Sequence, residues 1–218
     1  MMMDEALAAQ IGKSALVAVL VIDDAQNAVP LAKAILESGI NALEITLRTP
    51  AALDAVTKIK AEVPQIIAGI GTILNKDQVN EAKKRGAAFG VAPGLNNTVL
   101  DEAKRVGLPY APGISTASEI EAAYEKGCNV LKLFPAENLG GLKYLKNVNA
   151  PYAHLGIKYI PLGGLSIGNL KDYLENDSVL AIGGSWLAPR DLIKAKDWVQ
   201  ISKNCAEARA IVEQVRGK

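Results

Sequence analysis

The chain has 218 residues, of which 50% are hydrophobic and 22% are charged, so it can bury a full core and has the size of one α/β barrel. Its 24 Lys and Arg residues balance 23 Asp and Glu residues without a block of like charge, which gives no indication of nucleic-acid or membrane-surface binding. We therefore expect a single domain over residues 1–218.

The N-terminus and the scarce metal-binding residues exclude further classes of protein. Residues 1–5 are acidic and no apolar run approaches membrane-spanning length, so we expect a cytoplasmic protein. Cys128 and Cys205 are the only cysteines, and we expect them to be reduced and without function. His154 is the only histidine, so a catalytic zinc with two or three imidazole ligands is disfavoured. We expect no metal and no cofactor.

Short apolar runs that end in turns rich in glycine or proline alternate with helical patterns along the chain. Eight runs are predicted to be strands: Ala15–Ile22, Ala42–Leu47, Ile66–Gly71, Phe89–Pro93, Tyr110–Gly113, Val130–Pro135, Tyr159–Gly164 and Leu180–Gly184. Glycines after a charged or polar last turn mark helix ends, as at Gly39, Gly86, Gly107 and Gly127. A further helix, over about Asp4–Ile11, precedes the first strand.

Eight strand–helix units in about this length predict an α/β fold of the closed (β/α)₈ type, a TIM barrel, with the extra N-terminal helix covering its bottom. An open, doubly wound sheet is the alternative, although such a sheet rarely needs eight short parallel strands. In a barrel, the functional residues lie at the C-terminal ends of the strands and in the loops that follow. Polar residues at those positions are therefore the candidate site.

A lysine lies inside the sixth predicted strand, in the sequence NVLKLFPA of residues 129–136. Burying an ammonium without a partner costs several kcal/mol, so such a lysine tends to lose its proton and become a nucleophile that forms Schiff bases. The alternative is a lysine at a strand end that reaches solvent. Strand alternation places Lys132 and Phe134 on one face, and Pro135 ends the strand. Lys132 is therefore expected to face inward near the strand's C-terminal end.

Polar residues alternate in the second predicted strand, where residues 43–48 read LEITLR. Glu44, Thr46 and Arg48 are two residues apart and so point to one face. An inward Glu44 could form a buried ion pair with Arg48 or Lys132, or it could move protons in imine chemistry. Arg48 suits bidentate binding of a substrate carboxylate, unless it is simply a solvated loop residue.

Pairs of glycines follow the last two predicted strands, at Gly163–Gly164 and Gly183–Gly184. Barrels commonly bind a phosphate there through backbone N–H groups and the N-terminus of a short helix. A single pair is more often a tight turn, but two pairs on these two strands favour a phosphorylated ligand.

Six segments together resemble the 2-keto-3-deoxy-6-phosphogluconate (KDPG) aldolases, the class I aldolases of the Entner–Doudoroff pathway. They occur in the family's order over nearly the whole chain, at residues 43–49, 69–75, 93–94, 112–116, 132–136 and 182–186. The resemblance implies an aldehyde-lyase of carbohydrate metabolism that forms homotrimers.

The resemblance also implies residue roles. Lys132 would form the Schiff base with the substrate ketone, and Glu44 would be the general acid/base. The other matched residues would bind the pyruvate carboxylate (Arg48, Thr72), line the pyruvyl pocket (Pro93, Phe134) and hold the phosphate (Gly163, Gly164, Gly184, Ser185).

One position departs from the family pattern. Leu162 stands where the family usually has a threonine near the substrate hydroxyls, and a leucine can neither donate nor accept that hydrogen bond. Discrimination between C4 epimers is therefore expected to be weakened or altered.

The expected reaction is cleavage of KDPG to pyruvate and glyceraldehyde 3-phosphate through an imine on Lys132. Alternatives are the phosphogalactonate epimer or 4-hydroxy-2-oxoglutarate as substrate, and a phosphate-binding barrel isomerase with Glu44 as base and Lys132 as a charged electrophile. A barrel that serves only as a scaffold is disfavoured, because it would not explain why Lys132, Glu44 and Arg48 converge on one mouth.

Overall fold

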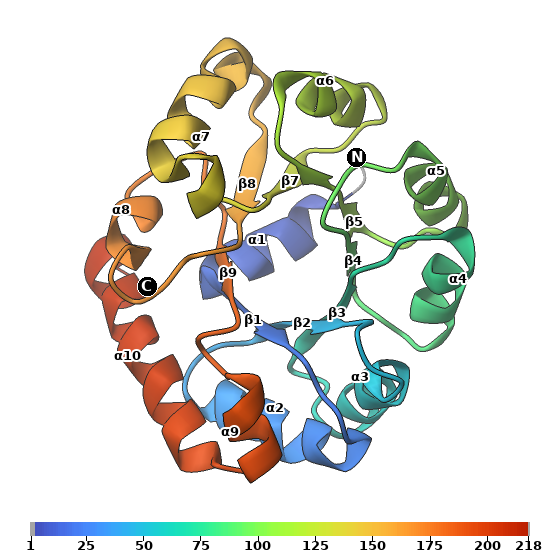
Figure 1. The fold of residues 1–218 in the computed structure, drawn as a ribbon, viewed down its shortest axis with the longest axis vertical. Coiled ribbons are helices and arrows are strands. Elements are labelled where there is room, and N and C mark those ends of the chain that lie inside the picture. Colours follow the sequence, from blue (N-terminus) through green and yellow to red (C-terminus); the bar gives the residue numbers. More distant parts are fainter. Residues whose placement is uncertain (1–2, 218) are drawn as a thin grey trace.

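Strands and helices alternate along the chain, and the strands gather around a common centre with most of the helices outside them (Figure 1). The structure, a computed structural model, describes residues 3–217, so Met1 and Met2 of the acidic N-terminal segment, and Lys218, lie outside it. The strands are β1 (Leu16–Leu20), β2 (Ala42–Thr46), β3 (Ile67–Gly71), β4 (Gly90–Val91), β5 (Tyr110–Ala111), β6 (Gly113–Ile114), β7 (Val130–Leu133), β8 (Lys158–Pro161) and β9 (Ile182–Gly184). The α-helices are α1 (Glu5–Ser14), α2 (Ala28–Glu37), α3 (Ala52–Glu62), α4 (Lys76–Lys84), α5 (Asn97–Val106), α6 (Ala117–Glu125), α7 (Gly141–Asn149), α8 (Leu170–Leu174), α9 (Arg190–Ala195) and α10 (Trp198–Arg216). Short 3₁₀ helices are η1 (Ala25–Asn27), η2 (Glu137–Leu139) and η3 (Ala150–Leu155).

The strands pair in parallel and form two adjoining sheets. One sheet has the order β5-β4-β3-β2-β1-β9, and the other has the order β6-β7-β8. Backbone bonds join them at both edges. The N–H of Leu180, just ahead of β9, donates to Tyr159 O of β8 (2.8 Å), and Lys132 N–H of β7 donates to Pro112 O, between β5 and β6 (2.9 Å). The result is an α/β fold with a curled parallel sheet.

The fifth predicted strand is interrupted. Pro112 has no N–H group and cannot donate to a strand ladder, so the segment divides around it. Tyr110 and Ala111 pair with β4, whereas Gly113 and Ile114 pair with β7. The prediction of one continuous strand over residues 110–113 was therefore wrong.

Helix ends follow the local sequence signals. Asp4 caps α1, because its side chain accepts a hydrogen bond from the N–H of Leu7 (2.7 Å). None of the helices within residues 3–217 is long and apolar enough to cross a membrane. The predicted glycine stops are confirmed, since all four have φ between +66° and +85°, the left-handed region that ends a helix: Gly39, Gly86, Gly107 and Gly127.

Alternate residues of each strand point inward or outward. In β1, Leu16 and Leu20 point outward and pack with the helices in the larger apolar core, whereas Val17 and Val19 belong to a smaller inner cluster. The strand period of two therefore gives the sheet an outer core and an inner core.

The inner face changes from apolar to polar along the strands. In β2, Ala42 precedes Glu44 on this face, and in β7, Val130 precedes Lys132. Because all strands run in the same direction, the polar residues collect at their C-terminal ends. The apolar layer lies below them.

The chain ahead of β1 packs against the N-terminal ends of the strands. The N–H of Met3 donates to Asn129 Oδ1 (3.2 Å), and Asn129 Nδ2 donates to Met3 O (2.9 Å), directly ahead of β7. Met3 is fully buried, and Ile11 of α1 joins the same inner cluster as Val130. This end of the sheet is thus filled, and the opposite end carries the polar residues.

Candidate active site

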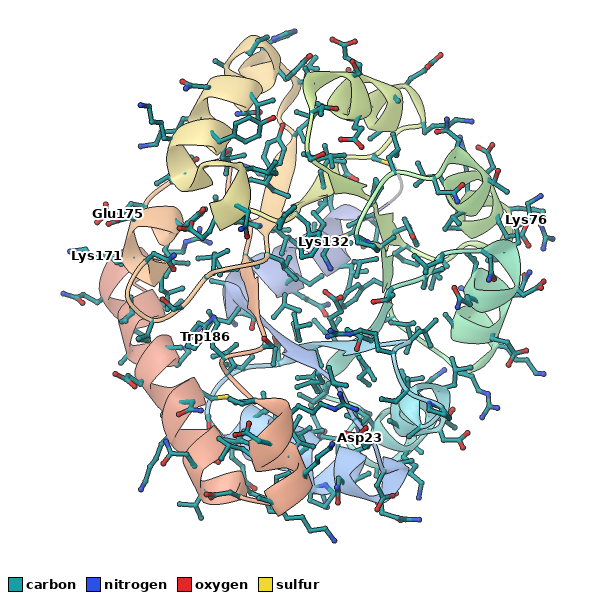
Figure 2. All side chains as sticks on the ribbon, in the orientation of Figure 1. Asp23, Lys76, Lys132, Lys171, Glu175 and Trp186 are labelled. Carbon is teal, nitrogen blue, oxygen red and sulfur yellow. The ribbon has the colours of Figure 1, made fainter. Side chains whose placement is uncertain are left out.

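A buried ion pair joins β7 to β2 in the centre of the curled sheet. Lys132 Nζ donates to Glu44 Oε1 (3.1 Å) and lies 3.3 Å from Oε2, and the two side chains are only 8% and 3% exposed. The ammonium also lies 5.5 Å from the centre of the Phe134 ring, within the range of a cation–π contact. Figure 2 shows Lys132 near the centre of the molecule, among the strands.

This pairing corrects one step of the sequence analysis. Lys132 faces inward, but it is not without a partner, because Glu44 neutralises it. Glu44 in turn pairs with Lys132 and not with Arg48. A buried pair and an acid/base role are compatible, because a carboxylate 3.1 Å from an ammonium is placed to accept its proton.

Gly71 provides the space that Glu44 occupies. Gly71 is the last residue of β3, and it pairs with Thr46 of β2. A Cβ atom added to Gly71 would lie 2.1 Å from Glu44 Oε1, closer than any real contact. The Glu44 carboxylate therefore fills the volume that any side chain at position 71 would take.

Arg48 and Thr72 follow β2 and β3 at the mouth of this site. Arg48 is exposed, and among residues 3–217 no carboxylate forms an ion pair with its guanidinium. Thr72 has φ +62°, a left-handed conformation that is unfavourable for a β-branched residue. Backbone strain of this kind is concentrated at functional sites.

The candidate residues surround one cavity of about 350 Å³ at the C-terminal ends of the strands. It collects every residue that was given a site role except Gly164, and it adds three that were given none, of which Gly183 belongs to the second predicted glycine pair. The lining residues are Val19, Glu44, Thr46, Arg48, Thr72, Pro93, Lys132, Phe134, Leu162, Gly163, Gly183, Gly184 and Ser185. Of the three additions, strand alternation in β1 and β2 was a signal for Val19 and Thr46.

Gly164 lies outside the cavity because it faces the segment after β7. Its φ is +82°, and a Cβ atom placed on it would lie 2.6 Å from Glu137 Cβ. The N–H of Glu137 donates to Gly163 O (3.0 Å) and holds this turn against η2. Gly163 borders the cavity, whereas Gly164 lets the turn pack closely against Glu137.

Leu162 presents an apolar surface to the cavity. It is 5% exposed, and a Cβ atom added to Gly183 of β9 would lie 2.5 Å from Leu162 Cγ. The leucine therefore extends across to β9 and rests on Gly183. It offers no hydrogen bond to a ligand.

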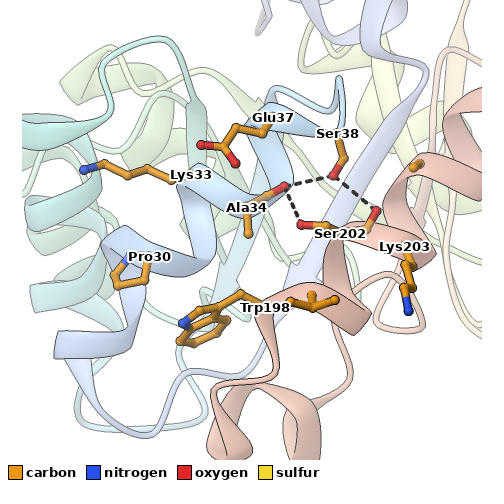
Figure 3. Close-up of a pocket in the computed structure, with 10 residues that line it drawn as sticks. Pro30, Lys33, Ala34, Glu37, Ser38, Trp198, Ser202 and Lys203 are labelled. Atoms are coloured by element: carbon orange, nitrogen blue, oxygen red, sulfur yellow. Dashed lines mark hydrogen bonds between the residues drawn. The ribbon is translucent and has the colours of Figure 1, made fainter.

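A larger hollow of about 640 Å³ lies on the outside of the molecule, between α2 and α10 (Figure 3). Ser38 Oγ lies 2.9 Å from Ala34 O and 3.2 Å from Ser202 O, and Ser202 Oγ lies 3.3 Å from Ala34 O. These contacts fasten the two helices together. The charged Lys33 and Glu37 are exposed at its rim, so the hollow lacks the buried nucleophile and carboxylate of the inner cavity.

The cysteines and the histidine lie outside the lining of the inner cavity. Cys128 and Cys205 are free and buried, and burial raises the pKa of both thiols to about 12, so both are protonated at neutral pH. His154 is exposed in η3. The Lys132 amine is therefore the candidate nucleophile of the inner cavity.

A curled parallel sheet with a lysine–carboxylate pair and glycine turns at its C-terminal ends defines a lyase of the aldolase type, and the family comparison agrees. The sequence model of the family described as KDPG and KHG aldolase matches residues 7–204. The chain therefore belongs to this aldolase family.

Individual relatives show the same similarity. The "KHG/KDPG aldolase" of Escherichia coli (strain K12) is 43% identical over 192 residues, which are 88% of this chain and 89% of the relative. A KDPG aldolase from Legionella pneumophila, solved with pyruvate captured as a covalent carbinolamine, has a TM-score of 0.88 at 32% identity, covering 92% of this chain and 97% of that one. The Zymomonas mobilis ZM4 enzyme, solved with 3-phosphoglycerate, has a TM-score of 0.85 at 35% identity, covering 94% and 95%.

Replacing Gly71 by alanine should displace the Glu44 carboxylate from Lys132, because the new Cβ atom would lie 2.1 Å from Oε1. We expect aldolase turnover to fall by at least about tenfold, toward the roughly 10²- to 10⁴-fold that general acid/base catalysis typically contributes. Adding Glu44→Asp, which shortens the acid by one methylene, should restore part of the lost turnover. Steady-state kcat of the single and double variants measures both effects.

Gly168→Ala is the matched control, because its Cβ would meet only Ser166 Oγ at 3.7 Å. Wild-type kcat in Gly71→Ala, or a double variant that is slower than Gly71→Ala, would contradict this assignment of Gly71.

Proposed function

We propose that this chain cleaves 2-keto-3-deoxy-6-phosphogluconate to pyruvate and glyceraldehyde 3-phosphate through a Schiff base on Lys132. The observation that carries the proposal is the buried pair of Lys132 and Glu44, within 3.1 Å of each other in a cavity at the C-terminal ends of the strands. An amine and a carboxylate in contact supply the nucleophile and the proton carrier that imine chemistry needs.

The first half of the reaction builds the imine. Glu44 accepts a proton from the Lys132 ammonium, and the free amine attacks the C2 ketone to give a carbinolamine. Glu44 then returns a proton to the carbinolamine hydroxyl, which leaves as water and produces an iminium ion. The distance between Nζ and Oε1 supports this transfer, since it is already that of a hydrogen bond.

The second half breaks the carbon–carbon bond. Glu44, directly or through a water, removes the proton of the C4 hydroxyl, and the C3–C4 electrons move toward the iminium nitrogen. The aldehyde is released and an enamine of pyruvate remains on Lys132. Glu44 returns the proton to C3 of the enamine, and hydrolysis of the resulting iminium releases pyruvate. The iminium is the electron sink, so the reaction as written uses no metal or other cofactor.

Different lining residues would bind the two charged ends of the substrate. Arg48 and Thr72 would bind the carboxylate, while Gly163, Gly184 and Ser185 would bind the phosphate through backbone N–H and hydroxyl groups. The backbone N–H of Gly164 would bind the phosphate beside that of Gly163, in the same turn. Pro93 and Phe134 would line the space around the three pyruvyl carbons.

The contacts between the two sheets, and between the N-terminal segment and the strands, support a closed barrel. We propose a closed (β/α)₈ barrel with α1 as its bottom cap, forming one domain over the whole chain. The backbone bonds at both edges between the two sheets and the contact of Met3 with Asn129 support it. A cytoplasmic homotrimer is the expected form.

A second substrate, 4-hydroxy-2-oxoglutarate, is the main alternative. Its support is the name of the Escherichia coli relative, which includes both substrates, and the apolar Leu162 beside the cavity. A coupled lactate dehydrogenase assay with each candidate keto acid, including the phosphogalactonate epimer, measures pyruvate release and ranks them.

Incubation with pyruvate and borohydride should attach a reduced pyruvyl group to Lys132, because only an imine is trapped in this way. Peptide mass spectrometry locates the adduct. Lys158→Arg is the control, since Lys158 is exposed and its Nζ donates to Asp177 O (2.8 Å). An adduct on Lys158 would refute the assignment of Lys132, and complete absence of an adduct would favour the isomerase, with Lys132 as a charged electrophile.

Glu44→Gln should separate imine formation from turnover. Glutamine keeps the size of the side chain and can still accept a hydrogen bond from Lys132, but it cannot carry a proton between steps. We expect kcat to fall by about 10²-fold or more, while some borohydride trapping remains. Unchanged kcat would show that another group, or water alone, moves the proton.

Leu162→Thr should shift kcat/KM toward the gluconate epimer by roughly tenfold to a hundredfold, because a new hydroxyl can bond the substrate hydroxyl. Leu162→Val is the matched control, since valine has the shape of threonine without its hydroxyl. The wild-type enzyme should accept both epimers or prefer the gluconate one by a small margin. Strong wild-type selectivity that neither substitution alters would mean that Leu162 does not face that hydroxyl.

A further inference from the structure

We infer that Thr46 is a positioning residue that aims Arg48 at the substrate carboxylate, an inference that rests on the proposed function. Thr46 ends β2 and lies in the lining of the cavity, yet it is only 2% exposed. Arg48, two residues later, is exposed. A long, exposed side chain of this kind needs a fixed contact to be held in one direction.

Thr46 contacts Arg48 twice. The N–H of Arg48 donates to Thr46 O (2.7 Å), which closes a tight three-residue turn at the end of the strand. Arg48 Nε donates to Thr46 Oγ1 (3.1 Å). The backbone bond fixes where the arginine leaves the chain, and the side-chain bond fixes where its guanidinium lies.

The threonine hydroxyl is itself anchored to the neighbouring strand. Thr46 Oγ1 donates its only proton to Leu20 O of β1 (3.0 Å), so it can meet further partners only as an acceptor. It is therefore oriented to receive the Nε–H of Arg48, and it has no proton left to donate to a substrate. Thr46 acts on the substrate through Arg48.

This arrangement decides which part of the guanidinium meets the ligand. With Nε engaged by Thr46, the two terminal nitrogens of Arg48 remain to form a planar fork, the geometry that binds a carboxylate with two parallel hydrogen bonds. No ion pair with a carboxylate in the described part of the chain competes for them. The fork is ordered before substrate arrives, which lowers the entropy cost of binding.

The test compares Thr46→Val with Thr46→Ser. Valine keeps the branched shape but removes the hydroxyl, whereas serine keeps the hydroxyl. In Thr46→Val we expect KM for the keto acid to rise about tenfold, the effect of losing a hydrogen bond to a charged group, while kcat changes less than about threefold. Thr46→Ser should restore KM to near the wild-type value. Thr46→Ala serves as a second hydroxyl deletion if the valine variant does not fold.

A double variant and a control variant distinguish the positioning of Arg48 from a general loosening of the turn after β2. In Arg48→Met, adding Thr46→Val should raise KM no further, because the side chain that it positions is absent. Thr49→Val is the matched control, since Thr49 Oγ1 donates to Ile22 O, two residues after β1, and forms no hydrogen bond with Arg48 in the described part of the chain. Its KM should stay near the wild-type value.

A KM increase of equal size in Thr46→Val and Thr49→Val, or an undiminished increase in the Arg48→Met background, would overturn the positioning role. If the wild-type protein released no pyruvate from any candidate keto acid, the proposed function would fail instead. If Arg48→Met raised KM but Thr46→Val did not, the inference about Thr46 alone would fail.

Discussion

The buried contact between Lys132 and Glu44 is the constraint to which the rest of the structure is fitted. Removing two opposite charges from water is unfavourable unless each faces the other at close range, so β2 and β7 must place these side chains within hydrogen-bond distance. They belong to different sheets and are 88 positions apart in the sequence, so the curl of the strands is what brings them together. The missing side chain at Gly71 then gives the carboxylate its volume.

Along the strands, the inner face of the sheet has an apolar layer that stabilises the fold and, beyond it, a polar layer that faces the cavity. Toward the N-terminal ends of the strands, Val17, Ala42 and Val130 pack with Met3 in a closed apolar layer. Two residues further along the same strands, Glu44 and Lys132 face the cavity. Because the lower layer supplies the packing, the upper layer can hold polar groups whose burial is unfavourable.

Sequence reasoning located most of the strands and the faces of the important side chains, because strand alternation and glycine stops are local signals. It could not choose the partner of Glu44, since that depends on how distant strands meet. It also missed the break at Pro112, where an apolar run reads as continuous although one N–H is absent. The close approach of Gly164 to Glu137 was also not predicted, because it depends on how the turn after β8 meets η2, which no local pattern encodes. Thr46 was identified as inward-facing, yet its bond to Leu20 O becomes visible only when β1 and β2 are paired.

The backbone of Thr72 has a consequence for how this protein can change. A β-branched residue held at φ +62° stores strain of about 1–3 kcal/mol, which a glycine or asparagine would largely relieve. Selection for a more stable fold alone would therefore replace this threonine, while a requirement for its hydroxyl at the cavity would retain it. If Thr72 binds the substrate carboxylate as proposed, fold stability and ligand binding favour different residues at position 72, and a library selected only for folding should drift away from threonine there.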